Sequence, residues 1–376
     1  MRPVCPLAGS ARHRDLRYRI TAGVRICPVS SSKSSSSVPG PARPSHKRAS
    51  PPAPGVASRP RKARLELIRE RLLAWYAAHQ RPLPWRLSRD PYAILVSEIM
   101  LQQTQVERVI PKYREFLERF PTLKSLAAAP LGEVIRAWGP LGYNQRAVRL
   151  HQLANLVMER RSGKLPTQPD ELIELPGLGP YTAAAVACFA FDRPVATLDT
   201  NVRRVLGRVL SDEPGFATRS GRALAAAAGS VLPVDRAADW NQALMDLGAT
   251  VCTARTPSCH RCPLAEACAA RRTLQQTPGR PVRRAAEGRV AYRADEPYVG
   301  STRFYRGRIV DRLRELTPGA DLTIDELGSA ILPGFEPARR EWLLRLLQRL
   351  AADGLVVLAD DGPAAASATA VRVALP

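Results

Sequence analysis

The stretch 175-LPGLGPYTAAAVACFAF-191 places two glycines in a tight turn directly before an apolar run. Gly177 and Gly179 are expected to adopt backbone angles that other residues disfavour, which permits a sharp turn. The following run is long enough for a helix, and the backbone N–H groups at a helix start can bind a phosphate oxygen. The stretch therefore predicts a turn that holds a nucleic-acid phosphate. An ordinary packing turn is the alternative, since Pro-Gly-x-Gly turns are common.

The sequence on both sides of this turn has a helical pattern, from residue 63 to about residue 270. Segments 65–79 and 145–160 carry apolar residues at three-to-four spacing, and Pro and Gly separate such segments. No alternating β pattern of useful length occurs in this part of the sequence. We therefore predict an all-α domain over residues 63–275.

The sequence after this domain has a different composition. Residues 276–300 are rich in Arg, Pro and Gly and are interpreted as a linker. Three helical stretches and two short β-like runs follow, over residues 302–316, 323–332, 336–354, 355–360 and 369–375. Three helices and then a hairpin is the order of a winged helix-turn-helix. Residues 301–376 are therefore predicted to form a small winged-helix-like α+β domain, with a helical protein-interaction module as the alternative.

The charge of the 376-residue chain is strongly positive and unevenly distributed. Residues 1–64 hold 14 Lys and Arg against the single acid Asp15, within a formal net charge of +22 for the whole chain. Residues 1–62 are also rich in Ser and Pro, which predicts a disordered basic tail. The remaining positive charge indicates a polyanionic partner, with nucleic acid first and a membrane surface second. No segment reaches the roughly 20 apolar residues of a membrane span.

Four of the seven cysteines form the pattern C-x6-C-x2-C-x5-C, at Cys252, Cys259, Cys262 and Cys268. Clustered cysteines in a chain without a secretion signal indicate a metal in a reducing compartment rather than disulfides. Zinc sites usually contain two short C-x2–4-C pairs, and only Cys259 and Cys262 form one here. Four thiolates in one compact loop can instead hold a [4Fe–4S] cluster. The spacing ranks an iron–sulfur cluster above zinc.

Two acidic residues stand in contrasting surroundings. Glu98 lies inside the mostly apolar run 92-YAILVSEIMLQQTQ-105. Its charged form is therefore disfavoured, and the pKa of its carboxyl group is expected to rise. Asp199 in 197-TLDTNVRRVLGRVL-210 comes just before a helix, where N-capping is the ordinary role of an aspartate. Asp199 is expected to stay ionised.

The glycine turn, Asp199 and the four-cysteine loop follow one another as in the helix-hairpin-helix DNA glycosylases of the endonuclease III superfamily. Within that superfamily, residues from about 65 to 270 resemble the MutY family of A/G-specific adenine DNA glycosylases. The resemblance rests on the stretches 83-LPWR-86, 97-SEIMLQQTQV-106, 141-LGYNQRA-147, 175-LPGLGPYTAAAV-186, 198-LDTNVRRVL-206 and 240-WNQALMDLGATVC-252.

The resemblance implies a helix-hairpin-helix glycosylase fold with a [4Fe–4S] loop at 252–268, and hydrolysis of the bond between adenine and deoxyribose. Glu98 is implied as the acid that protonates N7 of adenine, and Asp199 as the carboxylate that stabilises the sugar cation. Tyr181 stands where bifunctional relatives carry a Schiff-base lysine, so a monofunctional hydrolase is implied. Tyr181 and Asn201 are implied to position the sugar and Asp199.

The same resemblance implies the contacts with DNA. Removing a base requires flipping it out of the duplex. Gln103 would fill the space that the base leaves, Tyr143 would support the opposite side, and Gln102 and Thr104 would contact the opposite base. The resemblance also implies that Trp85, Arg86 and Gln242 line the adenine pocket. Gly177 and Gly179 would hold a phosphate. The implied partner is double-stranded DNA with a mismatched or oxidised base pair, bound by a monomer.

Two features depart from the family and leave alternatives open. Typical members continue into a Nudix-like domain with an F-S-H loop, which residues 301–376 lack, so the preference between 8-oxoguanine and guanine opposite adenine is open. Asn144, where many members have a second aromatic residue, also resembles thymine/uracil mismatch glycosylases. A non-enzymatic iron–sulfur DNA-binding regulator is the alternative of another class, although keeping both Glu98 and Asp199 argues against it. Localisation is expected to be cytoplasmic and nucleoid-associated, with import into an organelle by the Arg- and Ser-rich tail as the lesser alternative.

Overall fold

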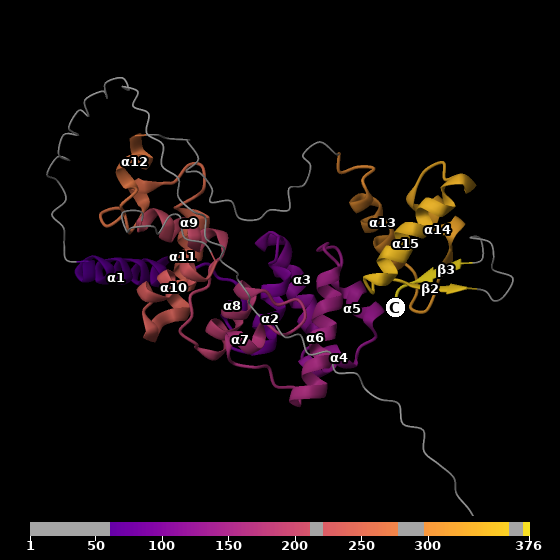
Figure 1. Cartoon of the computed structure of the whole chain (residues 1–376), viewed down its shortest axis with the longest axis horizontal. Helices are drawn as coiled ribbons and strands as arrows, with labels where there is room; N and C mark the ends of the chain where they lie inside the picture. The colour runs from indigo at the N-terminus through magenta and orange to yellow at the C-terminus, as the bar shows by residue number, and fades with distance from the viewer. Residues whose placement is uncertain (1–60, 211–220, 277–296, 361–370) are drawn as a thin grey trace, which may run out of the picture. The chain divides into compact units, whose positions relative to one another are not determined.

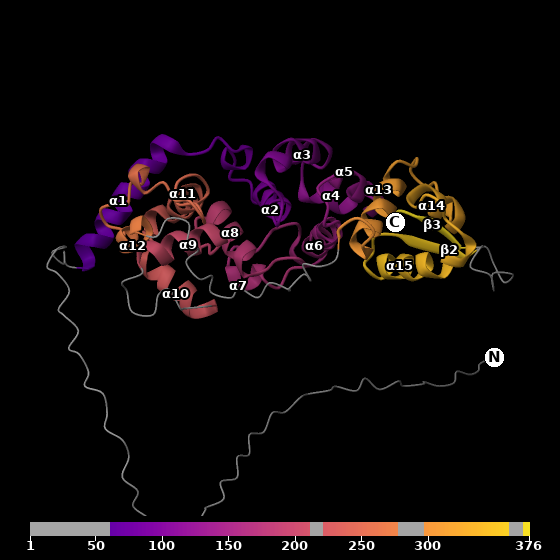
Figure 2. The same cartoon turned by 90° about the horizontal axis from the view of Figure 1, so that it is seen from above.

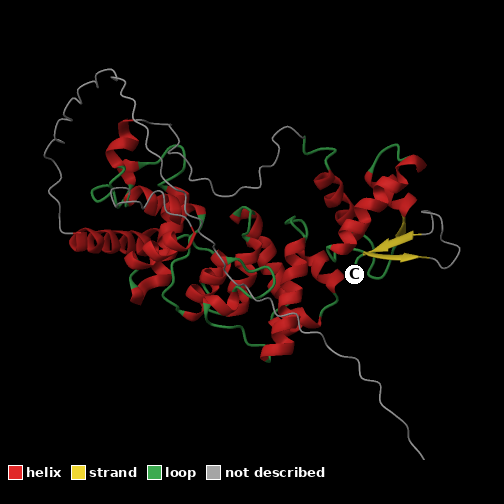
Figure 3. Ribbon diagram, viewed as in Figure 1, coloured by secondary structure: helices red, strands yellow, loops and turns green. Residues whose placement is uncertain are grey.

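The computed structural model describes residues 61–210, 221–276, 297–360 and 371–376. Nearly all of them lie in helices and the loops between them, and the strands occur after residue 320 (Figures 1 and 3). The prediction of an all-α domain is therefore confirmed. Most of the predicted tail and of the predicted linker lies outside the described residues. None of the helices in the described ranges is long and apolar enough to cross a membrane.

The helices that follow the tail make up the first domain. Their bounds are α1 Arg61–His79, η1 Pro84–Arg86, α2 Pro91–Met100, α3 Val106–Arg119, α4 Leu123–Ala128, α5 Leu131–Trp138, α6 Gln145–Arg161, α7 Pro169–Leu172, α8 Pro180–Phe191, α9 Thr200–Val209, α10 Gly221–Val231, η2 Val234–Arg236, α11 Ala237–Thr250, η3 Cys259–Arg261 and α12 Arg271–Gln276.

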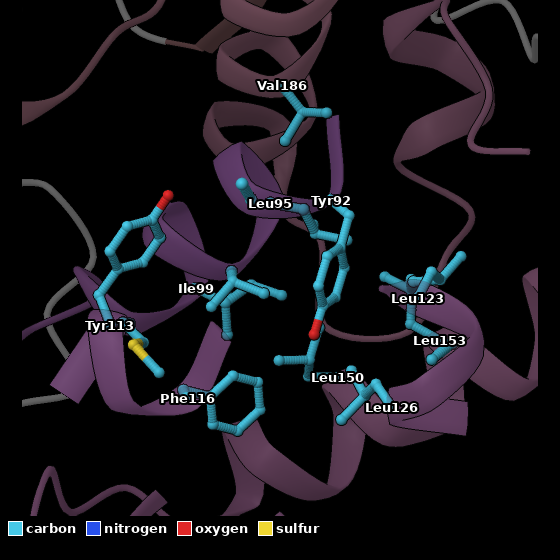
Figure 4. Close-up of a cluster of buried hydrophobic side chains, with 14 of the residues drawn as sticks. Tyr92, Leu95, Ile99, Tyr113, Phe116, Leu123, Leu126, Leu150, Leu153 and Val186 are labelled. Atoms are coloured by element: carbon cyan, nitrogen blue, oxygen red, sulfur yellow. The ribbon is translucent and has the colours of Figure 1, made fainter. Parts of the chain in front are cut away.

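A first hydrophobic core surrounds α2. This helix starts at Pro91, where Asp90 accepts hydrogen bonds from the backbone N–H groups of Tyr92 and Ala93 and so caps the helix. Because α2 is apolar on all sides, it is buried on all sides. Figure 4 shows the packing of α2 against its neighbours, with the labelled side chains Tyr92, Leu95, Ile99, Tyr113, Phe116, Leu123, Leu126, Leu150, Leu153 and Val186. Glu98 therefore lies on the most enclosed helix of the domain.

A second hydrophobic core lies between α1, α9, α10 and α11. Leu72 of α1, Val205 of α9 and Leu244 of α11 are all almost fully buried in it. Cys188 of α8 also belongs to this core, and Asn241 Nδ2 lies 3.3 Å from its sulfur. Helices α2 and α8 thus bring the first core against the second, and the candidate site lies where they meet.

The C-terminal residues form a small α+β domain around a third hydrophobic core. Its elements are α13 Thr302–Arg314, β1 Leu322–Thr323, α14 Ile324–Ile331, η4 Pro337–Arg339, α15 Arg340–Ala352, β2 Val357–Asp360 and β3 Val371–Ala374. The strands pair antiparallel in the order β1-β3-β2, with Val373 facing both Leu322 and Leu358. The winged-helix-like prediction is confirmed. It missed β1, because two residues are too few for an alternating pattern.

Candidate active site

A cavity of about 80 Å³ opens between the two cores, which is room for more than one water molecule. It contains the predicted acid and all three predicted pocket residues. Its lining is Arg81, Leu83, Trp85, Arg86, Ile94, Ser97, Glu98, Leu101, Val106, Tyr181, Phe189, Gln242 and Met245. These residues come from five segments of the chain, and the fold brings them together.

Glu98 is 6% exposed, and its Oε2 atom has no hydrogen-bond partner among the described residues. Burial raises the pKa of the Glu98 carboxyl from 4.5 to about 7, while a hydrogen bond from the Tyr181 hydroxyl opposes part of the rise. The negative charge of Asp199 raises the same pKa further. Glu98 therefore holds a proton near neutral pH, and it lines the cavity. This is the arrangement of a general acid.

Asp199 caps α9, as its position in the sequence suggested. One of its oxygens accepts from the Val202 N–H at 2.6 Å and the other accepts from Asn201 Nδ2 at 2.9 Å. Burial raises the pKa of Asp199, and these two hydrogen bonds oppose the rise because they stabilise the carboxylate. Asp199 is thus a second carboxyl group close to the cavity, in a more polar environment than Glu98.

Asn201 links Asp199 to the cysteine loop through Arg204. The Arg204 guanidinium donates to Asn201 Oδ1 and to the Gly248 carbonyl, both at 2.7 Å, and to the Cys252 carbonyl at 2.9 Å. Only glycine fits at position 248, because a Cβ there would lie 2.6 Å from the Asn201 Cβ. The sequence predicted Asn201, and the only signal for Arg204 was its place in the quoted stretch 198-LDTNVRRVL-206.

Arg86 is held by a buried carboxylate that the sequence analysis missed. Asp246 side-chain oxygens accept from Arg86 Nη1 at 2.7 Å, from Arg86 Nη2 at 2.9 Å and from Arg81 Nε at 2.6 Å. Burial alone raises the pKa of Asp246, but the two arginines outweigh it and lower the pKa. Gln242 is similarly fixed, since the Tyr76 hydroxyl donates to its Oε1 at 2.5 Å. The polar side of the pocket is therefore fixed before any base enters.

Replacing Asp246 by asparagine is expected to destabilise the protein by about 3–5 kcal/mol, since a buried guanidinium then lacks its counter-charge. The Asp246 side chain has no exposed surface and that of Arg86 is 9% exposed, so solvent cannot compensate. Urea unfolding of Asp246→Asn measures the loss. The control is Asp239→Asn. Asp239 lies on the same helix as Asp246, α11, and this change removes its exposed ion pair with Arg236. Equal stability of the two variants would contradict the prediction.

The residues predicted to open the duplex lie on two loops. Gln103 is exposed with a φ of 57°, and Tyr143 is 50% exposed with a φ of 47°. Both are in the left-handed region, which is uncommon for residues other than glycine. Gln102 Nε2 donates to Thr182 Oγ1 at 3.2 Å, and Thr104 Oγ1 donates to the Gln102 carbonyl at 3.4 Å. Both loops thus present one exposed side chain on an unusual backbone.

Arg146 joins these two loops, a role that was not predicted from the sequence. Its guanidinium is buried and donates to the Met100 carbonyl at 2.8 Å, to the Gln102 carbonyl at 2.6 Å and to the Gly142 carbonyl at 3.0 Å. Burial lowers the pKa of Arg146 to about 10. Its place in the quoted stretch 141-LGYNQRA-147 was the available signal.

The glycine turn differs in part from its prediction. Gly177 has a φ of 82°, as expected, but Gly179 has a φ of −91° and an extended backbone, so the expected conformation is wrong there. Gly179 caps α8, and a Cβ built on it would meet nothing within 4 Å. A side chain would therefore occupy the open space in front of the helix start. The open space at this helix start is compatible with the predicted phosphate contact.

The four cysteines line one mostly apolar cavity, together with residues such as Val205, Leu247 and Leu274. Burial raises the pKa of the Cys262 thiol to about 11 in the metal-free chain, and binding to iron replaces the proton. Arg208, itself buried, donates to Cys252 Sγ at 3.2 Å. Four soft ligands around one cavity with a cationic donor fit an iron–sulfur cluster.

The buried Glu98 and the partly buried Asp199, together with a helix-hairpin-helix turn and a four-cysteine loop, define the chain as a helix-hairpin-helix DNA glycosylase. The model of the HhH-GPD superfamily base excision DNA repair proteins matches residues 96–220. The model of the iron-sulfur binding domain of endonuclease III matches residues 252–268, which confirms an iron–sulfur cluster over zinc.

The chain is similar to named relatives across most of its length. The adenine DNA glycosylase of Mycolicibacterium smegmatis is 43% identical over 295 residues, which cover 77% of this chain and 93% of that protein. The human adenine DNA glycosylase is 42% identical, and the aligned region covers 57% of this chain and 41% of that protein. A solved structure of a thermostable thymine-DNA glycosylase is 31% identical, with a TM-score of 0.53, and covers 56% of this chain and 98% of that chain. The chain belongs to the adenine DNA glycosylase family.

Proposed function

We propose that this protein hydrolyses the N-glycosidic bond of adenine that is mispaired with 8-oxoguanine or guanine in double-stranded DNA. The observation that carries the proposal is the Glu98 carboxyl group. It is buried, its Oε2 has no hydrogen-bond partner in the part of the chain that the structure describes, and it lines one cavity with Trp85, Arg86 and Gln242. A flipped adenine in this cavity offers ring nitrogens to such a group, whereas thymine and uracil have no N7 to protonate.

The reaction follows from the two carboxyl groups. Neutral Glu98 gives its proton to N7 of adenine, so that the base leaves as a neutral molecule while the glycosidic bond breaks. The Asp199 carboxylate stabilises the positive charge that develops on the sugar. A water molecule then adds to the anomeric carbon and releases its proton, which leaves an abasic site. No lysine lines the cavity within the described residues, and the Tyr181 phenol cannot form an imine, so we propose a monofunctional hydrolase.

The [4Fe–4S] cluster, when bound, cross-links residues 252–268 and takes no part in the hydrolysis. Cys252, Cys259, Cys262 and Cys268 are the residues that would hold it. Arg255 and Arg261 are exposed on the same loop. We propose that these two side chains contact DNA phosphates next to the glycine turn.

A panel of duplexes tests the function and its alternatives. The protein is incubated with duplexes that contain A·8-oxoG, A·G, T·G or U·G, and abasic sites are then cleaved with alkali. We expect cleavage of the adenine strand, and the ratio of the rates on A·8-oxoG and A·G gives the opposite-base preference. Cleavage of only the T·G and U·G strands would establish the thymine/uracil alternative. No cleavage by cluster-loaded protein would support the DNA-binding regulator.

We also propose that the protein acts as a monomer in a reducing compartment that contains DNA. Glu98, the pocket residues and the four cysteines are brought together by the fold of a single copy, which supports a monomer. Light scattering of the protein bound to one duplex measures the stoichiometry, and a 2:1 complex would contradict the monomer. Cell fractionation tests the compartment.

A further inference from the structure

The C-terminal domain packs directly on the part of the first domain that carries Tyr143. Ile135 of α5 and Val148 of α6 are fully buried in the same hydrophobic core as Leu313, Leu347 and Leu350 of the C-terminal domain. In Figures 1 and 2, α13 lies beside α5. The Arg136 guanidinium of α5 donates to the carbonyls of Arg314 and Leu316, at 2.7 and 2.6 Å. Apolar contacts and hydrogen bonds thus fix the end of α13 on α5.

Arg314 extends from this joint to the loop of residues 139–144. Its Nε donates to the Ile135 carbonyl at 2.9 Å, and its Nη2 donates to the side chain of Asn144, at Oδ1, at 2.7 Å. The guanidinium also covers Gly139 so closely that a Cβ there would lie 3.2 Å from it. Asp311 binds Nη1 at 2.7 Å, which leaves the Arg314 side chain 11% exposed. Arg314 therefore contacts both ends of the loop.

The loop needs support because Tyr143, between Gly142 and Asn144, has a left-handed backbone. Such a conformation persists only when the surroundings hold the neighbouring residues. The first domain holds Gly142, whose carbonyl accepts from Trp138 Nε1 at 3.2 Å and from Arg146 Nη2 at 3.0 Å. The side chain of Asn144, on the other side, makes no capping bond for α6 and is bound by Arg314.

The net charge of the C-terminal domain indicates that this domain does not serve as a general electrostatic attractor of DNA. Residues 297–376 contain ten arginines, no lysine and ten acidic residues, so their formal net charge is zero. Residues 61–276 contain 30 Lys and Arg against 20 Asp and Glu, a formal net charge of +10. The C-terminal domain therefore adds no net positive charge to counterion release, the main sequence-independent source of DNA affinity.

We propose that the C-terminal domain serves adenine excision as a brace, in which Arg314 positions Asn144 and thereby holds Tyr143 in place to open the duplex. The inference rests on the proposed function. It gives Asn144 a role as the acceptor for Arg314, so this residue is no sign of thymine specificity. Arg314 and Asn144 are positioning residues, since neither lines the cavity.

The test compares Arg314→Ala, Asn144→Ala and the double variant on a duplex with A·8-oxoG. Each single variant is expected to lower the single-turnover excision rate about 10- to 100-fold, because without a fixed Tyr143 the target adenine is misplaced relative to Glu98. The double variant is expected to be no slower than the slower single variant, since the two substitutions remove the same contact between Arg314 and Asn144. Arg345→Ala is the matched control, because it removes an arginine whose ion pair with Glu341 is exposed.

A second readout separates positioning from folding. Fluorescence of 2-aminopurine placed beside the adenine reports unstacking, and in a Glu98→Gln background it does so without excision. We expect Arg314→Ala and Asn144→Ala to reduce this signal, with little change in melting temperature for Asn144→Ala. Unchanged excision and unstacking in Asn144→Ala would overturn the proposal even if Arg314→Ala proves unstable. If the wild type excises adenine and the variants do so equally well, the brace proposal is wrong but the proposed function stands. If the wild type does not excise adenine, the proposed function is wrong.

Discussion

Glu98→Gln is expected to lower the single-turnover rate of adenine excision by roughly 10²–10⁴-fold, the usual contribution of a general acid. Glutamine has nearly the same shape and still fits the site, but it cannot donate a proton to N7. Binding to mismatched duplex should therefore stay near that of the wild type. Rates from alkali cleavage and affinities from a gel-shift assay give the two quantities. Glu118→Gln, an exposed change on α3, is the control and should leave both unchanged.

The same substitution should stabilise the protein at alkaline pH. The pKa of Glu98 is about 7 in the folded chain against 4.5 for the free side chain. Because the pKa of Glu98 is higher in the folded chain, the wild type loses stability as the pH rises from 4.5 to 7. The loss is about 1.4 kcal/mol for each unit by which the folded and unfolded pKa values differ. Above pH 7 the loss totals about 3 kcal/mol, and glutamine avoids it. Urea unfolding at pH 5 and pH 8 should show the stabilisation of Glu98→Gln at the higher pH only.

Asp199→Asn is expected to lower the excision rate by roughly 10²–10³-fold, because a neutral amide cannot offset the charge that develops on the sugar. Asparagine caps a helix as well as aspartate does, so α9 and the fold should persist. The control is Asp192→Asn at the exposed end of α8. Single-turnover rates and melting curves of both variants make the comparison. A rate of Asp199→Asn within threefold of the wild type would show that this carboxylate does not stabilise the transition state.

The features that the sequence indicated are those with a local signature. Glu98 was conspicuous as a carboxyl group among apolar residues, and the four cysteines had a spacing. Asp199 stood at a helix start, and three helices with a hairpin indicated the C-terminal domain. In each case the residues that form the pattern are close together in the chain, so the pattern survives without knowledge of the fold.

The features that the sequence did not indicate depend on partners far apart in the chain. Asp246 holds Arg86 from 160 positions away, and Arg314 reaches Asn144 over 170 positions. A single aspartate or arginine in a helix carries no sequence pattern that shows whether its side chain meets a buried partner or solvent. The prediction of an unusual φ at Gly179 was wrong, because the turn needs a positive φ only at Gly177 and Gly179 has an extended backbone.

The dependence of the wild-type excision rate on pH tests the central claim most directly, namely that burial keeps Glu98 protonated for catalysis. Single-turnover rates on the A·8-oxoG duplex are measured from pH 5 to pH 9. We expect the rate to fall about tenfold per pH unit above a midpoint near 7, where Glu98 loses its proton. Glu98→Gln should lack this decline. A wild-type rate that stays constant up to pH 9 would contradict the account.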